Sequence, residues 1–385
     1  MFFYTDQDPN FRIKGSRDPL GFQPLWQSLG RTVIKYLSTV SINIKDFQIL
    51  SYAWFFYGDR DPKDFLKFFY KFEQAYGFAR GEYIIDDTFN GIGFVRKNLV
   101  NGVFTFSNKS QHTLLSNQKS YGIFGKYNRP FTEMEIKEQE DFREVMEDSL
   151  RQKVDFEAIQ VKIQRLITQD EVTMNLEEIK IFADSIQTLT KIEKEFYTKH
   201  ILKTEDHHVQ NELFELFGQD EELIKFDKFN LFGFIHSLRG KEISIELDEY
   251  LIDIEQSEKV LTPFVYLFKT LQNEPIWNEQ KVEEQSIFQT FPRAFNHTFK
   301  TDIIAQLNES LKYEPYHIAL EAVKRNNAIS DNRGNAAWIK NENNQLITCY
   351  NDGSRHFDEV KVGEDFEHNY FLPAYVSMYK QIMKS

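Results

Sequence analysis

Residues 61–77, DPKDFLKFFYKFEQAYG, contain the clearest helix signal in the sequence. Asp61 has a side chain suited to a helix N-cap, and Pro62 is favoured at the first helical position. Aromatic residues then recur at helical spacing, which places them along one face: Phe65, Phe68, Phe69, Phe72 and Tyr76. The spacing predicts an amphipathic helix that starts at Asp61, ends before Gly77 and buries this face.

Apolar residues at helical spacing continue on both sides of this segment. Upstream, the pattern predicts one helix over residues 24–37 and a second over residues 46–57. Downstream, residues 132–135 (TEME) have the form of a capping box, and Asn175 followed by Glu178 indicates another helix start. Helices separated by short polar breaks are expected to continue to about Leu271.

The last third of the chain has a different pattern. Apolar runs at residues 337–339 and 345–350 flank the turn-forming residues 341–344 (NENN), which is typical of a β-hairpin. The sequence therefore predicts a mainly α, multi-domain protein with small α+β parts, in which a helical body carries a C-terminal hairpin or winged-helix-like module. The expected domains are a basic one (1–132), an acidic helical one (133–274) and a C-terminal α+β module (275–385).

Charge is unevenly distributed along the chain. Residues 1–132 contain 17 Lys and Arg against 11 Asp and Glu, whereas the remainder contains 29 against 48. Residues 88–132 contain no Asp or Glu at all; we call them the acid-free segment. Such asymmetry favours a polyanionic partner, because neutralising phosphates releases their counterions. The alternative is that the basic part docks against the acidic part of the same chain or against an acidic protein.

Nucleic acid, with DNA favoured over RNA, is the predicted polyanion. Aromatic residues interleave with the cations of the acid-free segment, a mixture that single-strand binding surfaces use, although a phenylalanine in a strand usually belongs to the core. Two glycine-containing stretches, residues 15–21 and 116–122, have groups suited to phosphate, but structural turns look the same. The predicted nucleic-acid-binding residues are Arg17, Arg96, Lys97, Lys109, Gln118, Lys119, Lys126 and Arg129.

Sequence motifs of familiar enzyme classes are missing. The chain has no Walker A loop, no GxGxxG, no GxSxG and no HExxH. One alternative is a metal-dependent nuclease, in which Glu359 and Lys361 lie on a strand and Asp331, Asp352 or Asp358 helps to hold Mg²⁺. A solvated strand face explains the same residues, and His200, His207 and His208 lack a further metal ligand. No catalytic residue, metal or cofactor is predicted.

The compartment expected from the sequence is the cytoplasm. The single cysteine, Cys349, has no partner for an internal disulfide, and the N-terminus lacks the pattern of a signal peptide. The longest dense apolar run, residues 52–57, is far shorter than a membrane span needs. No membrane partner is expected.

Four short segments together resemble a group of uncharacterised bacterial proteins associated with antiphage defence gene clusters. These segments are residues 15–21 (GSRDPLG) with Trp26, residues 29–31 (LGR), residues 115–122 (LSNQKSYG) and residues 369–373 (NYFLP). The resemblance implies a component of a multi-protein defence system, with an ATPase, helicase or nuclease as partner. It implies no fold and no catalytic residue. The favoured hypothesis is a non-catalytic subunit that binds nucleic acid and proteins; the alternatives are the nuclease and a purely protein-binding adaptor.

Overall fold

The computed structural model describes residues 18–85, 87–99, 102–225, 230–351 and 357–384. Over these residues it contains 17 α-helices and two small antiparallel sheets, which confirms a mainly α protein with small α+β parts. None of the described helices is both long and apolar enough to cross a bilayer.

The chain divides into two units, each formed from two stretches of sequence. Unit 1 comprises Met1–Val33 and Lys225–Tyr370, and unit 2 comprises Ile34–Ile224 and Phe371–Ser385. The boundary expected after residue 132 lies inside unit 2, and the one expected after residue 274 lies inside unit 1.

Unit 2 contains most of the helices. Its elements are α2 (Ile44–Tyr57), α3 (Pro62–Tyr83), α4 (Ile92–Asn98), β1 (Val103–Ser107), η2 (Ser110–His112), α5 (Gln118–Tyr121), α6 (Ile123–Glu133), η3 (Ile136–Glu138), α7 (Phe142–Lys153), α8 (Phe156–Thr168), β2 (Glu171–Asn175), α9 (Leu176–Ile186), α10 (Lys191–Tyr197), the π-helical turn η4 (Thr198–Leu202), α11 (His208–Gln219), η5 (Glu221–Ile224) and α17 (Leu372–Met383).

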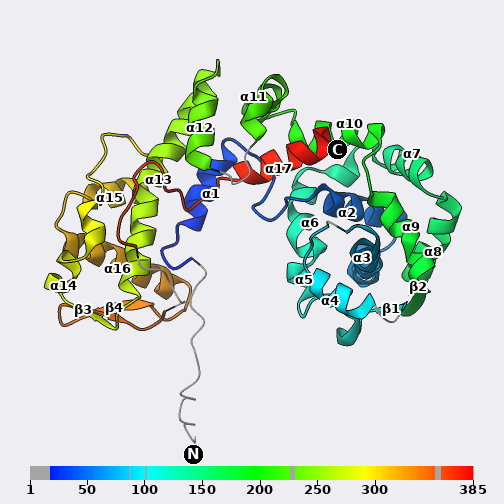
Figure 1. Cartoon of the computed structure of the whole chain (residues 1–385), viewed down its shortest axis with the longest axis horizontal. Coiled ribbons are helices and arrows are strands. Elements are labelled where there is room, and N and C mark those ends of the chain that lie inside the picture. Colours follow the sequence, from blue (N-terminus) through cyan, green and yellow to red (C-terminus); the bar gives the residue numbers. More distant parts are fainter. Residues whose placement is uncertain (1–17, 86, 100–101, 226–229, 352–356, 385) are drawn as a thin grey trace, which may run out of the picture. The chain divides into compact units, whose positions relative to one another are not determined.

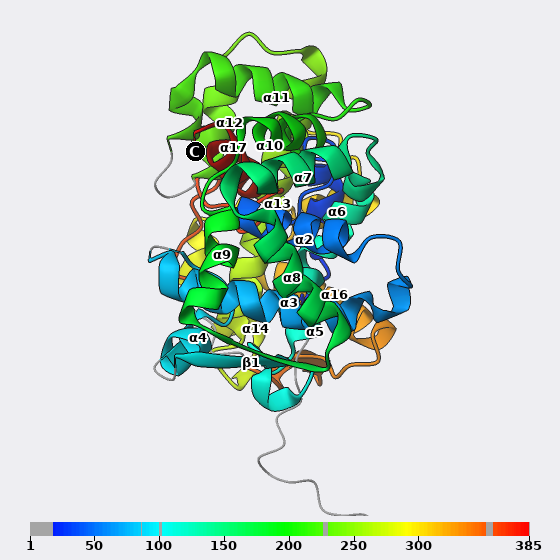
Figure 2. The ribbon, with the colours of Figure 1, turned by 90° about the vertical axis from the view of Figure 1, so that its right-hand side faces the viewer.

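Helix α3 is the centre of unit 2. It packs against α2, α4, α8, α9 and β1, and Figures 1 and 2 show it enclosed by these elements. Its start is as predicted, since the Asp61 side chain accepts a hydrogen bond from the Lys63 backbone N–H at 3.0 Å. The predicted end before Gly77 is wrong, because the helix continues to Tyr83. A Cβ on Gly77 would lie 2.7 Å from Leu114 Cδ1, so this glycine allows close packing and does not end the helix.

Of the two capping boxes predicted from the sequence, one is present and one is not. The capping box of α9 is present, with Asn175 and Glu178 each bonded to the other's backbone N–H. The box expected at residues 132–135 is wrong: Thr132 lies in the last turn of α6, and Glu135 has a left-handed φ of 51°. Strand β1 pairs in antiparallel register with β2, which falls in a region expected to be helical.

Unit 1 is built around the long helix α13. Its elements are α1 (Gln23–Arg31), α12 (Leu231–Arg239), α13 (Ile245–Leu271), β3 (Ile276–Trp277), α14 (Glu279–Glu283), η6 (Ser286–Gln289), α15 (Asp302–Ser310), α16 (Pro315–Asn332), β4 (Ile339–Glu342) and β5 (Gln345–Thr348). The strands form a sheet in the order β3-β5-β4. The predicted hairpin is confirmed, and Asn343 and Asn344 at its turn have φ of 51° and 60°.

A buried carboxylate in α13 organises part of unit 1. Glu258 accepts hydrogen bonds from Tyr370 Oη at 2.5 Å and Thr262 Oγ1 at 2.6 Å, and it pairs with His368 Nδ1 at 3.1 Å. Burial alone would lower the pKa of His368, but the charge of Glu258 outweighs it and the pKa is raised. The His368 ring stacks on Trp26 of α1, so this cluster ties residues 368–370 and α1 to α13.

Candidate functional site

A buried glutamate in α3 meets the acid-free segment in unit 2. Glu73 Oε1 accepts a hydrogen bond from the Ile123 backbone N–H at 2.6 Å, and Oε2 accepts one from Gln118 Nε2 at 2.7 Å. Burial raises the pKa of Glu73 to about 7, even though both hydrogen bonds favour the charged form. The carboxylate therefore anchors the start of α6 to α3.

Gly122 permits this close approach. A Cβ at that position would lie 2.5 Å from the Gln118 carbonyl oxygen and 2.6 Å from Glu73 Oε1. Any other residue would force the backbone away from the carboxylate. The contact between α3 and the acid-free segment thus depends on a glycine between Gln118 and Ile123.

Seven residues further along α3 from Glu73, a buried arginine joins three parts of unit 2. Arg80 Nη1 donates to Asp46 of α2 at 2.6 Å, and Nε donates to Asp87 at 2.6 Å. The guanidinium also lies 4.5 Å from the centre of the Phe89 ring. Burial alone would lower the pKa of Arg80, but the two carboxylates outweigh it and the pKa is raised. This triad holds α2, α3 and residues 87–89 together.

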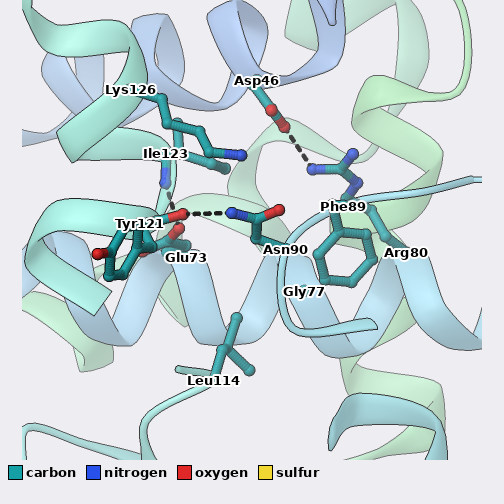
Figure 3. Close-up of a pocket in the computed structure, with 11 residues that line it drawn as sticks. Asp46, Glu73, Gly77, Arg80, Phe89, Asn90, Leu114, Tyr121, Ile123 and Lys126 are labelled. Carbon is teal, nitrogen blue, oxygen red and sulfur yellow. Dashed lines mark hydrogen bonds and ion pairs between the residues drawn. The ribbon is translucent and has the colours of Figure 1, made fainter. Parts of the chain in front are cut away.

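A hollow lies between the Glu73 anchor and the Arg80 triad. The deeper part is a cavity of about 20 Å³, and Figure 3 shows it with Asn90 and Lys126 above α3. It adjoins a groove of about 700 Å³ with which it shares Asp46, Phe89, Asn90 and Lys126. We call the two together the Lys126 groove. The residues that line its wider part come from the segment before and into α2, the segment after α3, α6 and α17: Thr39, Val40, Ile42, Asn43, Lys45, Asp46, Ile84, Asp87, Thr88, Phe89, Asn90, Lys126, Tyr127, Ser377 and Gln381.

The groove contains two lysines. Lys126 is half-buried, and its side chain extends over the cavity toward Asn90 in Figure 3. Burial lowers the pKa of Lys126, and the carboxylates of Asp46 and Glu73 offset part of this effect. Neither Lys126 nor Lys45 forms an ion pair with the residues that the structure describes, whereas Asp46 and Asp87 are both paired with Arg80.

Comparisons with protein-family models, with curated proteins and with solved structures find no match to this chain. The function is therefore inferred from the residues themselves.

The structure separates the predicted nucleic-acid-binding residues into three groups. Arg96, Lys97 and Lys119 are exposed and form no ion pair within the described part of the chain, although Arg96 Nη2 donates to the Ile85 carbonyl oxygen at 3.1 Å. Lys109 and Arg129 are exposed but paired, the first with Glu171 at 2.7 Å and the second with Glu133 at 2.8 Å. Of the remaining three, Lys126 lines the Lys126 groove, Gln118 is buried against Glu73, and Arg17 lies outside the described residues.

Several aromatic residues of the acid-free segment belong to the core. Phe104, Phe106 and Tyr127 are buried, whereas Phe94 and Tyr121 are 37% and 44% exposed. The interleaving of rings and cations in the sequence is therefore only partly present on the surface.

Sequence reasoning missed the residues that build the groove. Glu73 and Arg80 are seven residues apart on α3, so both project from a similar side of a helix that also carries an aromatic stripe. The sequence signal that could have identified Glu73 and Arg80 is that they are charged residues beside the apolar stripe of a helix. Their partners Asp46, Asp87 and Ile123 come from three other segments, and no local pattern connects them.

The residues of the nuclease hypothesis do not form the expected arrangement. Residues 359–361 are not in a strand; Glu359 and Lys361 are exposed and lie 3.7 Å apart. Asp352 lies outside the described residues. Among the residues described, no three or more His, Cys, Asp or Glu side chains are grouped so as to hold a metal ion. His207 instead caps α11, its Nδ1 accepting from the Gln210 backbone N–H at 3.2 Å.

Proposed function

We propose that this chain is a non-catalytic subunit of a cytoplasmic antiphage defence complex in bacteria, and that it binds nucleic acid through the acid-free segment. The supporting observation is the set of exposed cations, Arg96, Lys97 and Lys119, in a segment that has no carboxylate of its own. The acidic remainder of the chain is proposed to contact partner proteins such as an ATPase, helicase or nuclease.

The unpaired cations carry most of the expected affinity. Each one that contacts a phosphate releases condensed counterions, which makes binding favourable and salt-dependent. Lys109 and Arg129 are paired within the unit, but exposed ion pairs contribute only about 0–1 kcal/mol. Both can therefore exchange a carboxylate for a phosphate at little cost. We expect a non-specific mode, since phosphate contacts position a protein without reading sequence.

The test is a comparison of two triple charge reversals. Labelled single-stranded DNA, duplex DNA and RNA are titrated with the native protein between about 50 and 200 mM salt. Replacement of Arg96, Lys97 and Lys119 by Glu is expected to reduce the slope of log affinity against log salt by about three. The control replaces the exposed lysines Lys63, Lys191 and Lys340 by Glu, which alters net charge equally.

The two variants give distinct outcomes. Loss of binding in the variant of Arg96, Lys97 and Lys119, but not in the control variant, supports the proposal. Tighter binding of DNA than of RNA supports DNA as the polymer. Equal losses in both variants would mean that net charge alone attracts the polymer. Absence of binding by the native protein would leave the purely protein-binding adaptor, for which the internal pairs of Lys109 and Arg129 are the supporting observation.

A further inference from the structure

We propose that the Lys126 groove binds a single nucleotide, with the phosphate at Lys126 and Lys45 and the base beside Phe89. The inference rests on the proposed function, because the nucleotide is expected to belong to the strand that the acid-free segment holds.

The size of the groove suits such a ligand. Its volume of about 700 Å³ lies within the range of about 300–1,000 Å³ found for small-molecule sites. The deeper cavity of about 20 Å³ has room for one water molecule between Glu73 and Lys126. The groove therefore holds a ligand the size of a nucleotide above one water.

The charges favour an anion. Asp46 and Asp87 face the groove, but both are paired with the buried Arg80, at 2.6 Å each. Lys126 and Lys45 have no such partner among the described residues. A half-buried ammonium without an ion-pair partner has lost part of its hydration, and the nearby carboxylates of Asp46 and Glu73 compensate this loss at Lys126 only in part. A phosphate completes that compensation, and we expect the pKa of Lys126 to rise when it binds.

The remaining groups favour a planar base over a simple anion. Phe89 offers a ring whose position is fixed by the Arg80 guanidinium, 4.5 Å from its centre. The Asn90 amide is held by its Nδ2, which donates to the Tyr121 carbonyl oxygen at 2.9 Å. Its Oδ1 has no hydrogen bond within the described residues and can accept one from a base edge. Val40 and Ile42, both more than 40% exposed, add apolar contact area along the groove.

The walls of the groove are fixed before any ligand arrives. The Arg80 triad holds α2 and residues 87–89 to α3, and the Glu73 anchor holds the start of α6 to the same helix. A binding site assembled from rigid elements loses little conformational entropy on binding. The Lys126 groove is thus organised by interactions that do not themselves need the ligand.

The test measures mononucleotide binding and strand binding separately by calorimetry. The four deoxyribonucleoside monophosphates, inorganic phosphate and a single-stranded DNA are titrated into the native protein, Lys126→Gln, Asn90→Ala and the control Lys119→Gln. Lys119 lies on α5, is exposed and does not contact the groove. Removal of the half-buried charge in Lys126→Gln does not threaten folding, because burial already disfavours that charge.

We expect at least one nucleotide to bind more tightly than phosphate. Lys126→Gln is expected to weaken its binding about ten- to a hundredfold, as loss of a charged hydrogen bond does. Lys119→Gln is expected to leave mononucleotide binding unchanged and to weaken only strand binding. Equal affinity for phosphate and every nucleotide, or binding that Lys126→Gln leaves intact, overturns the inference. Mononucleotide binding without strand binding refutes the proposed function and leaves the groove as a free-nucleotide site.

Discussion

Replacement of Glu73 by Gln is expected to remove a loss of stability that the native protein undergoes as the pH rises. Burial raises the pKa of Glu73 from 4.5 to about 7 in the folded state. Between these two values the folded protein holds a proton that the unfolded chain has released. Linkage then requires the free energy of unfolding to fall with rising pH, because the folded state binds more protons. The stability is fully present below about pH 4.5 and is lost as the pH rises through 7.

The magnitude follows from the size of the shift. Each unit of pKa difference corresponds to about 1.4 kcal/mol, so a rise from 4.5 to about 7 costs about 3 kcal/mol at alkaline pH. Between pH 5 and 8 the native protein is expected to lose about 2–3 kcal/mol more than Glu73→Gln does. The glutamine amide also places an N–H opposite Gln118 Nε2, which is itself a donor. The stability lost through these two facing donors is the same at both pH values and cancels in the comparison.

The assay is urea unfolding of both proteins at pH 5 and pH 8, with hydrogen exchange of α3 peptides to assign the transition to unit 2. The control is Glu82→Gln, which removes an exposed carboxylate from the same helix. We expect the control to retain the pH dependence of the native protein. If Glu73→Gln also retains the pH dependence of the native protein, Glu73 does not titrate between pH 5 and 8 and burial does not raise its pKa into this range.

Three further substitutions probe contacts inside one unit or the other. Arg80→Met leaves two buried carboxylates without a counterion and is expected to cost about 3–5 kcal/mol in urea unfolding. Gly122→Ala forces a Cβ against backbone and carboxylate and is expected to cost about 1–3 kcal/mol, whereas Gly93→Ala, with no atom within 4 Å of its Cβ, is expected to lose none. Tyr370→Phe removes a hydrogen bond to buried Glu258 and is expected to cost about 1.5–3 kcal/mol, measured by exchange of α13 peptides.

Features of the fold that depend on neighbouring residues could be predicted from the sequence. The start of α3 at Asp61 and the start of α9 at Asn175 are set by side chains that bond to backbone within three residues. The hairpin turn at Asn343 and Asn344 is similar, because asparagine tolerates left-handed φ. Gly77 gave a wrong helix end, since its role is to admit Leu114 from a segment far along the chain.

The site was less predictable from the sequence because its residues, too, come from segments that are far apart along the chain. Gln118 and Lys119 are adjacent and were predicted together, yet one is buried against Glu73 and the other is exposed. The composition of a segment gives the sign of its net charge, but it does not show which of its side chains reach the surface. The Lys126 groove also needs Asp46 and Arg80, and these come from helices outside the acid-free segment.

The positive charge of the Lys126 groove persists after folding because of a single buried residue outside the acid-free segment. Folding places Asp46 and Asp87 in the walls of the same groove as Lys126, and these two carboxylates by themselves would neutralise it. Arg80 takes up both carboxylates in short ion pairs, where they are shielded from water and bound to a group that stays charged. Lys126 and Lys45 are then left for an external anion. A sequence count that assigns charge by segment misses this, because the neutralising arginine and the carboxylates it pairs with all lie before residue 88.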